Sequence, residues 1–164
     1  MKKIFKNALA LVAVALMACT VNAQEKGEMR IGAQMNYGLH SDYKNPGLGV
    51  RYQYCITDHF RIEPSANFFF KKDNMTMWDL NFNLHYVFQL APKFNIYPLG
   101  GLTLLGADYD FHDYSDSDTQ FGINLGGGVE YWLTHNFGFN GEVKYQFVDG
   151  WDRPVISAGV MYKF

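Results

Sequence analysis

The stretch WDLNFNLHYVFQL at residues 78–90 decides the fold, because its side chains alternate in character along the chain. Bulky apolar residues occupy the even positions from 78 to 90, and mostly polar residues occupy the odd positions between them. Successive side chains of a β-strand point to opposite faces, so a period of two predicts a strand with one apolar and one polar face. His85 falls on the polar face of this strand.

The same alternation recurs in seven other segments, and no helical period of 3.6 residues competes with it past residue 25. These segments are residues 29–39, 48–56, 60–70, 94–106, 121–133, 137–147 and 156–164. Segment 94–106 is apolar on both faces, so the pattern leaves its phase open. Eight strands of this kind predict an all-β protein.

Composition excludes two broad classes of protein. The chain has 164 residues, of which 48% are hydrophobic, 17% aromatic and 18% charged. So many aromatic residues and so few charges exclude intrinsic disorder. The formal net charge is −2, without a basic stripe, which argues against a nucleic-acid partner. The length fits one domain.

Residues 1–23 have the pattern of a cleaved signal peptide. Three lysines within residues 1–6 precede an apolar run at residues 8–18, and Val-Asn-Ala at residues 21–23 gives a small-x-small cleavage site. The run is shorter than the roughly 20 residues that a transmembrane helix needs. The resulting prediction is a signal peptide at 1–23 and one barrel domain at 24–164. A competing interpretation makes Cys19 the acylated residue of a lipoprotein.

The links between the strands alternate in length. Short links at residues 57–59, 91–93 and 134–136 interleave with longer polar links at residues 40–46, 71–74, 107–119 and 149–153. Short turns at one rim and long loops at the other are typical of outer-membrane barrels. Together with the eight alternating segments, this predicts an eight-stranded antiparallel up-and-down transmembrane β-barrel.

The polar faces of the strands indicate which side points inward. They carry mostly Asn, Gln, Ser and Gly, whereas the outside of a soluble barrel would carry many Lys and Glu. The charges on these faces come close to balance, so we expect them to pair inside a closed lumen, where an unpaired charge is costly; the alternative places some of them in water at the rims. The set is Arg30, Arg51, Arg61, Lys144 and Lys163 against Glu63, Asp79, Glu130 and Glu142.

The C-terminal residues carry a family resemblance. The chain ends on Phe164, preceded at every second position by Tyr162, Val160, Ala158 and Ile156. This pattern resembles the signal by which the assembly machinery recognises bacterial outer-membrane barrels. In size and hairpin rhythm the chain is similar to the small barrels of the outer membrane protein X and outer membrane protein A transmembrane-domain type. The resemblance implies a Gram-negative outer membrane, periplasmic termini and four outer loops.

Two further groups of residues are candidate sites. The loop at residues 107–119 holds five aspartates that could bind a cation or bridge to lipopolysaccharide, contact a partner, or only keep the loop soluble. They are Asp108, Asp110, Asp113, Asp116 and Asp118. Trp78, Trp132 and Trp151 are predicted to anchor strand ends at the membrane interface.

The expected function is structural or surface-interacting, without catalysis and without a cofactor. No strand carries a His and a Ser two residues apart on one face, as a lipid-modifying barrel enzyme would need. The expected partners are outer-membrane lipid, lipopolysaccharide, the barrel assembly machinery, and an envelope or external partner bound through the loops. A small pore or transport protein is the alternative, followed by a lipid-modifying enzyme and a soluble lipocalin-like binder.

Overall fold

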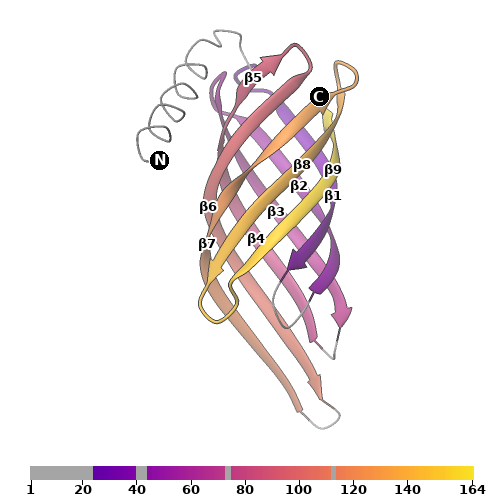
Figure 1. Cartoon of the computed structure of the whole chain (residues 1–164), viewed down its shortest axis with the longest axis vertical. Helices are drawn as coiled ribbons and strands as arrows, with labels where there is room; N and C mark the ends of the chain where they lie inside the picture. Colours follow the sequence, from indigo (N-terminus) through magenta and orange to yellow (C-terminus); the bar gives the residue numbers. More distant parts are fainter. Residues whose placement is uncertain (1–23, 40–43, 73–74, 112–113) are drawn as a thin grey trace, which may run out of the picture.

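The structure, a computed structural model, describes residues 24–39, 44–72, 75–111 and 114–164. These residues form a closed antiparallel barrel, which confirms the predicted all-β fold (Figure 1). The strands are β1 (Met29–Leu39), β2 (Lys44–Cys55), β3 (Phe60–Lys72), β4 (Met75–Tyr86), β5 (Phe88–Ala91), β6 (Phe94–Phe111), β7 (Tyr114–Trp132), β8 (Phe137–Val148) and β9 (Arg153–Lys163). Within the described ranges, no helix is both long enough and apolar enough to cross a bilayer.

Apart from β4 and β5, strands that follow one another in the sequence pair, and two further pairings close the wall. β1 pairs with β9, and β6 pairs with β4 as well as with β5. β4 and β5 are two parts of one strand interrupted at Val87, whose amide donates to the His59 carbonyl at 2.8 Å. The described barrel therefore has eight strands, and closure leaves no unpaired strand edge facing lipid.

The two faces of the wall differ as the alternation predicts. Outward side chains are apolar and exposed, with Met35 70%, Phe121 62% and Val50 59% accessible. Inward side chains are mostly polar and buried. In β6 the inward positions include Tyr97, Leu99 and Leu105, all buried. This explains why segment 94–106 is apolar on both faces.

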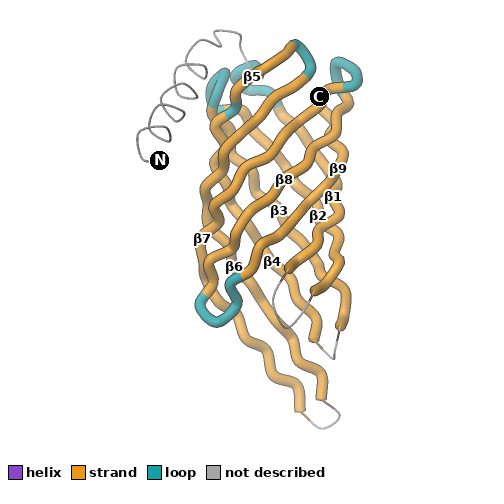
Figure 2. Tube along the Cα trace, viewed as in Figure 1, coloured by secondary structure: helices purple, strands orange, loops and turns teal. Residues whose placement is uncertain are grey.

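The two ends of the barrel are built differently. One end, here the terminal end, holds Phe164 and the tight turns that follow β2, β5 and β7 (Figure 2). In two of these turns a threonine hydroxyl accepts a hydrogen bond from a following amide, Phe60 to Thr57 at 2.9 Å and Phe137 to Thr134 at 3.0 Å. At the opposite end, here the hairpin end, β6 and β7 project well beyond the other strands (Figure 1).

The long loop predicted at residues 107–119 is instead mostly strand. Ala107 pairs with Asp118 and Phe111 with Tyr114, so the β6–β7 ladder continues to the tip. Backbone hydrogen bonds between strands form whatever the side-chain polarity, which is why acidic composition did not end the strands here. β2 and β9 likewise extend into the predicted links, beginning at Lys44 and Arg153.

The filled lumen as candidate functional site

A cluster of charges occupies the lumen near the terminal end. Glu130 of β7 accepts a hydrogen bond from Arg30 of β1 at 3.2 Å and forms an ion pair with Arg61 of β3. Glu28 lies closer to the rim, where it also pairs with Arg30 and contacts the Lys163 ammonium at 3.4 Å. Arginine suits this role because its guanidinium can donate to several acceptors at once.

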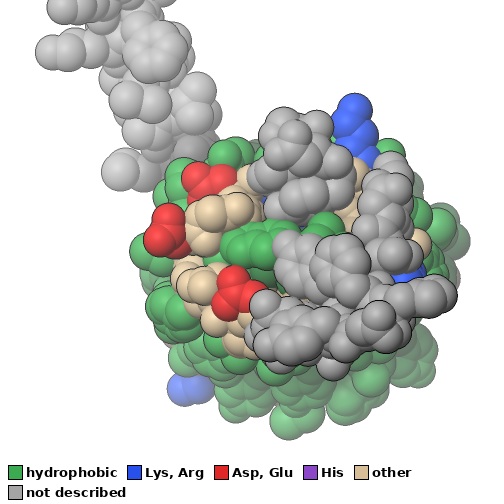
Figure 3. Space-filling model, turned by 90° about the horizontal axis from the view of Figure 1, so that it is seen from below, with side chains coloured by type: hydrophobic (Ala, Val, Ile, Leu, Met, Phe, Trp, Pro, Cys, Tyr) green, Lys and Arg blue, Asp and Glu red, His purple; other side chains and the backbone are tan. Residues whose placement is uncertain are grey.

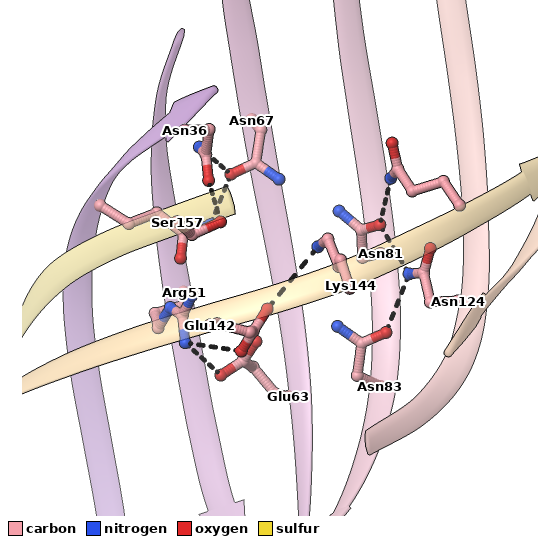
Figure 4. A network of polar contacts seen from close by, with 12 residues as sticks. Asn36, Arg51, Glu63, Asn67, Asn81, Asn83, Asn124, Glu142, Lys144 and Ser157 are labelled. Atoms are coloured by element: carbon pink, nitrogen blue, oxygen red, sulfur yellow. Dashed lines mark hydrogen bonds and ion pairs between the residues drawn. The ribbon is translucent and has the colours of Figure 1, made fainter. Parts of the chain in front are cut away.

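A second charge cluster lies in the middle of the lumen (Figure 4). Arg51 of β2 donates to the Oε2 atoms of both Glu63 and Glu142, at 3.1 and 3.3 Å. Lys144 of β8 lies on the other side of Glu142, with its ammonium 3.9 Å from Oε1. Two acids and two bases therefore balance where the side chains are at most 2% exposed, and pairing is what makes such burial tolerable.

A third cluster surrounds Asp79, closer to the hairpin end. Asp79 accepts hydrogen bonds from Asn67 and Asn81, both at 2.6 Å, and from Arg153 at 3.1 Å. Gln146 also donates to Asp79 at 3.2 Å, so each of the two carboxylate oxygens of Asp79 accepts two hydrogen bonds. A carboxylate with four donors needs no water to be satisfied.

Uncharged side chains extend the Asp79 cluster to further strands. Asn124 donates to the Oδ1 atoms of Asn81 and Asn83, at 2.8 and 2.9 Å (Figure 4). Asn36 donates to Asn67 at 2.8 Å and accepts from the Ser157 hydroxyl at 2.7 Å. These bonds join strands that are adjacent or one strand apart, β4 with β7, β3 with β1, and β1 with β9, and so they stiffen the wall from the lumen side.

An apolar plug closes the lumen at the hairpin end. Its members are buried inward side chains from β3, β4, β6, β8 and β9, with Trp151 packed against them. They are Phe69, Met75, Met77, Leu105, Ala107, Val148 and Val155. The Arg153 guanidinium lies 4.2 Å from the centre of the Phe69 ring, so it joins the plug to the Asp79 cluster beneath. Figure 3 looks onto this end and shows hydrophobic side chains around its rim.

The structure places all nine predicted lumen charges on the inward face. Eight of them are at most 2% exposed, while the Lys163 side chain lies at the terminal rim with 20% exposure. Sequence reasoning missed Arg153 and Glu28, which complete two of the clusters. Both lie two residues before an inward position, Arg153 before Val155 in β9 and Glu28 before Arg30 in β1. Extending the period of two beyond the apolar residues of each segment would have predicted them.

The three tryptophans do not share one role. Trp78 lies on the outward face of β4, half-buried, as expected of a wall residue. Trp132 instead turns inward at the terminal end, with Arg30 4.7 Å and Lys163 5.3 Å from its ring centre. Trp151 packs on the apolar plug. Trp132 and Trp151 therefore contact lumen residues at the two ends of the barrel, and their role as interfacial anchors stays a prediction.

The other predicted residues lie at the two ends and on the wall. Asp108 and Asp118 are exposed on the extended hairpin, and Asp110 and Asp116 belong to its paired strands. Asp113, Cys19 and the whole predicted signal peptide, residues 1–23, lie outside the described residues. In β9 and just after it, Ile156, Ala158, Val160, Tyr162 and Phe164 are all exposed on the outer wall.

The family assignment rests on the sequence as a whole. The outer membrane protein beta-barrel domain family matches residues 8–164. The chain belongs to this family. It is an outer membrane β-barrel protein, and its apolar outer wall is the surface that the family places in lipid. No curated protein sequence matches the chain.

Solved barrels share the fold at low sequence identity. The N-terminal β-barrel domain of Pseudomonas aeruginosa OprF is 19% identical, with a TM-score of 0.74, covering 86% of this chain and 100% of that one. Neisserial surface protein A is 20% identical, with a TM-score of 0.69, covering 84% and 96%. Ail, the attachment invasion locus protein of Yersinia pestis, is 18% identical, with a TM-score of 0.64, covering 85% and 99%. Such likeness establishes the fold of the outer membrane barrel and nothing finer.

Proposed function

We propose that this outer membrane barrel is a structural, surface-interacting protein that conducts no solute and catalyses no reaction. The observation that carries the proposal is burial at every level of the lumen. Met77 and Val155 at the hairpin end, Asp79 beneath them, Glu63 in the middle, and Glu130 near the terminal end are all 0% exposed. An eight-stranded barrel is narrow enough for side chains to fill it, so the useful surface is on the outside.

The proposed orientation puts the terminal end in the periplasm and the hairpin end outside the cell. It is supported by the tight turns at the terminal end and the long β6–β7 hairpin opposite, the arrangement usual in bacterial outer-membrane barrels. A signal peptide at residues 1–23 would bring the chain to the envelope. The exposed apolar residues of β9 and Phe164 would then be the signal for the assembly machinery of a Gram-negative cell.

The proposed contacts follow from the exposed surfaces. Lipid and lipopolysaccharide chains cover the apolar wall, and the hairpin end contacts envelope components or an external partner. Asp108 and Asp118 are exposed there, so this surface has acidic character at the hairpin. The names of Ail, an attachment invasion locus protein, and Neisserial surface protein A support a surface role.

Cysteine labelling on intact cells tests the orientation and the access of the hairpin. Asp118→Cys, on the hairpin, is expected to react with a membrane-impermeant maleimide in intact cells. His135→Cys, exposed in a terminal-end turn, is the matched control and should react only after the outer membrane is opened. Native Cys55 is 0% exposed and should stay unlabelled in both. The opposite labelling order contradicts the proposed orientation.

A further inference from the structure

Three neighbouring residues in the middle of the lumen each carry a buried polar atom that makes no hydrogen bond among the described residues. These atoms are Glu63 Oε1, His85 Nε2 and Glu142 Oε1, from β3, β4 and β8. One potential ligand atom from each of the three residues lies within 4.8 Å of the other two, and Glu63 Oε1 and His85 Nε2 are 3.9 Å apart. Their side chains are at most 2% exposed. We propose that these three atoms bind a single water molecule as a permanent part of the lumen.

Each of the two carboxylates is held through its Oε2 atom and keeps its Oε1 atom without a hydrogen bond, the Lys144 ammonium being 3.9 Å from Glu142 Oε1. Glu63 Oε2 accepts from Gln53 at 2.6 Å and from Arg51 at 3.1 Å. Glu142 Oε2 accepts from the Tyr97 hydroxyl at 3.0 Å and from Arg51 at 3.3 Å. The outer donors therefore fix both carboxylates, and the two Oε1 atoms remain as acceptors.

The third atom is a donor. Arg61 Nε donates to His85 Nδ1 at 3.0 Å, and a guanidinium has no acceptor to offer in return. Nδ1 therefore carries no proton, and the neutral imidazole holds its proton on Nε2, directed at the site. The Tyr97 ring stacks on the imidazole with centroids 4.6 Å apart and fixes its plane.

Glycine makes room for this stack. A Cβ at Gly128 of β7 would lie 2.4 Å from the Tyr97 hydroxyl oxygen and 2.5 Å from the ring carbon that bears it. Only glycine lets the Tyr97 ring lie flat against the wall here. Gly128 therefore leaves room for the Tyr97 ring, and the Tyr97 ring holds the His85 imidazole in place by stacking on it.

One donor and two acceptors match the hydrogen bonds of a water molecule, which accepts from His85 and donates to both glutamates. A central oxygen about 2.8 Å from each partner can reach three atoms up to about 4.9 Å apart, which covers the 4.8 Å within which potential ligand atoms of the three residues lie. Buried waters commonly make about three such bonds. The water would also separate two carboxylates that repel each other.

A metal ion fits the same atoms poorly. Zinc bonds of about 2.1 Å hold ligand atoms no more than about 3.6 Å apart, which is less than the 3.9 Å between Glu63 Oε1 and His85 Nε2. Because Nε2 of His85 carries the proton, it has no free lone pair to donate to a metal ion. Arg51 and Lys144 already neutralise the two carboxylates, so a cation would add uncompensated buried charge.

A high-resolution crystal structure of the refolded barrel tests the proposal, together with elemental analysis after incubation with zinc chloride. We expect one density peak about 2.6–3.1 Å from all three atoms, no retained zinc, and an imidazole nitrogen spectrum showing the Nε2–H form of His85. Zinc retained at one ion per chain, with anomalous density between the three atoms, overturns it. So does direct contact of the two glutamates with no peak between them.

A pair of variants separates the site from the fold. His85→Phe keeps a ring to stack on Tyr97 but removes the donor, so the peak is expected to disappear or to move away from position 85. His59→Phe, at the terminal end, is the matched control and should leave the peak in place. A peak unchanged in His85→Phe contradicts the role of Nε2. If His85→Phe does not fold, the density and the imidazole nitrogen spectrum of the native protein alone test the proposal.

Discussion

The middle of the lumen and its hairpin end are filled by opposite means. The middle holds Arg51, Glu63, Glu142 and Lys144, whose charges balance, whereas the hairpin end holds an apolar plug around Met77. Both sets have the same inward strand phase. The difference teaches that strand phase selects which side chains face the lumen. The side chains themselves can fill it either by charge pairing or by apolar packing. Mutations in the two regions should therefore lower the free energy of unfolding by different amounts.

The largest loss is expected from breaking a charge cluster. Glu130→Ala leaves the buried Arg61 guanidinium without its carboxylate, and removing one partner of a buried pair costs about 3–5 kcal/mol. The free energy of unfolding, from urea titration of the barrel in lipid vesicles, measures this loss. Glu25→Ala, exposed near the terminal end, is the control. Equal stability of the two variants would mean that paired charges do not stabilise the lumen.

A somewhat smaller loss is expected from the plug. Met77→Ala removes a fully buried side chain and should cost about 2–5 kcal/mol through lost packing and the cavity left behind. Met35→Ala on the outer wall, 70% exposed, tests the same chemical change outside the plug. The same urea titration compares them. A larger loss from Met35→Ala would contradict the inward assignment of the plug.

The comparison also requires the opposite face of the same strands to lie in lipid. Leu102, outward on β6, is 49% exposed, and Leu102→Arg should cost about 2–4 kcal/mol near the middle of the bilayer. Leu102→Phe keeps the position apolar and is the control. Vesicle refolding yields and unfolding titrations read out the difference. A tolerated arginine would show that this face is in water.

The smallest effect is expected on the hairpin. Asp118 is exposed, so Asp118→Asn should change the free energy of unfolding by no more than about 0.5 kcal/mol. Urea titration beside the native protein checks this. A loss of several times that size would show that the hairpin supports the barrel, rather than only extending from it.

Much of this lumen could be predicted from the sequence, because strand phase is visible in one strand at a time. The phase that places Glu130 inward also places Trp132 inward, at the end of β7. The partners could not be predicted. Arg30 and Glu130 are 100 residues apart and meet only because closure brings β1 near β7 across the lumen. The sequence does not reveal the plug, because alternation of apolar and polar residues predicts a polar lumen, whereas the plug residues are apolar and face inward.

Single-channel recording in planar bilayers tests the filled lumen most directly. The purified barrel, inserted from detergent into a salt-bathed bilayer, is expected to give no resolved current steps, both in the native form and in the Asp118→Asn variant. Uniform, reproducible steps from the native protein would contradict a lumen closed by its charge clusters and plug, and would make the barrel a small pore.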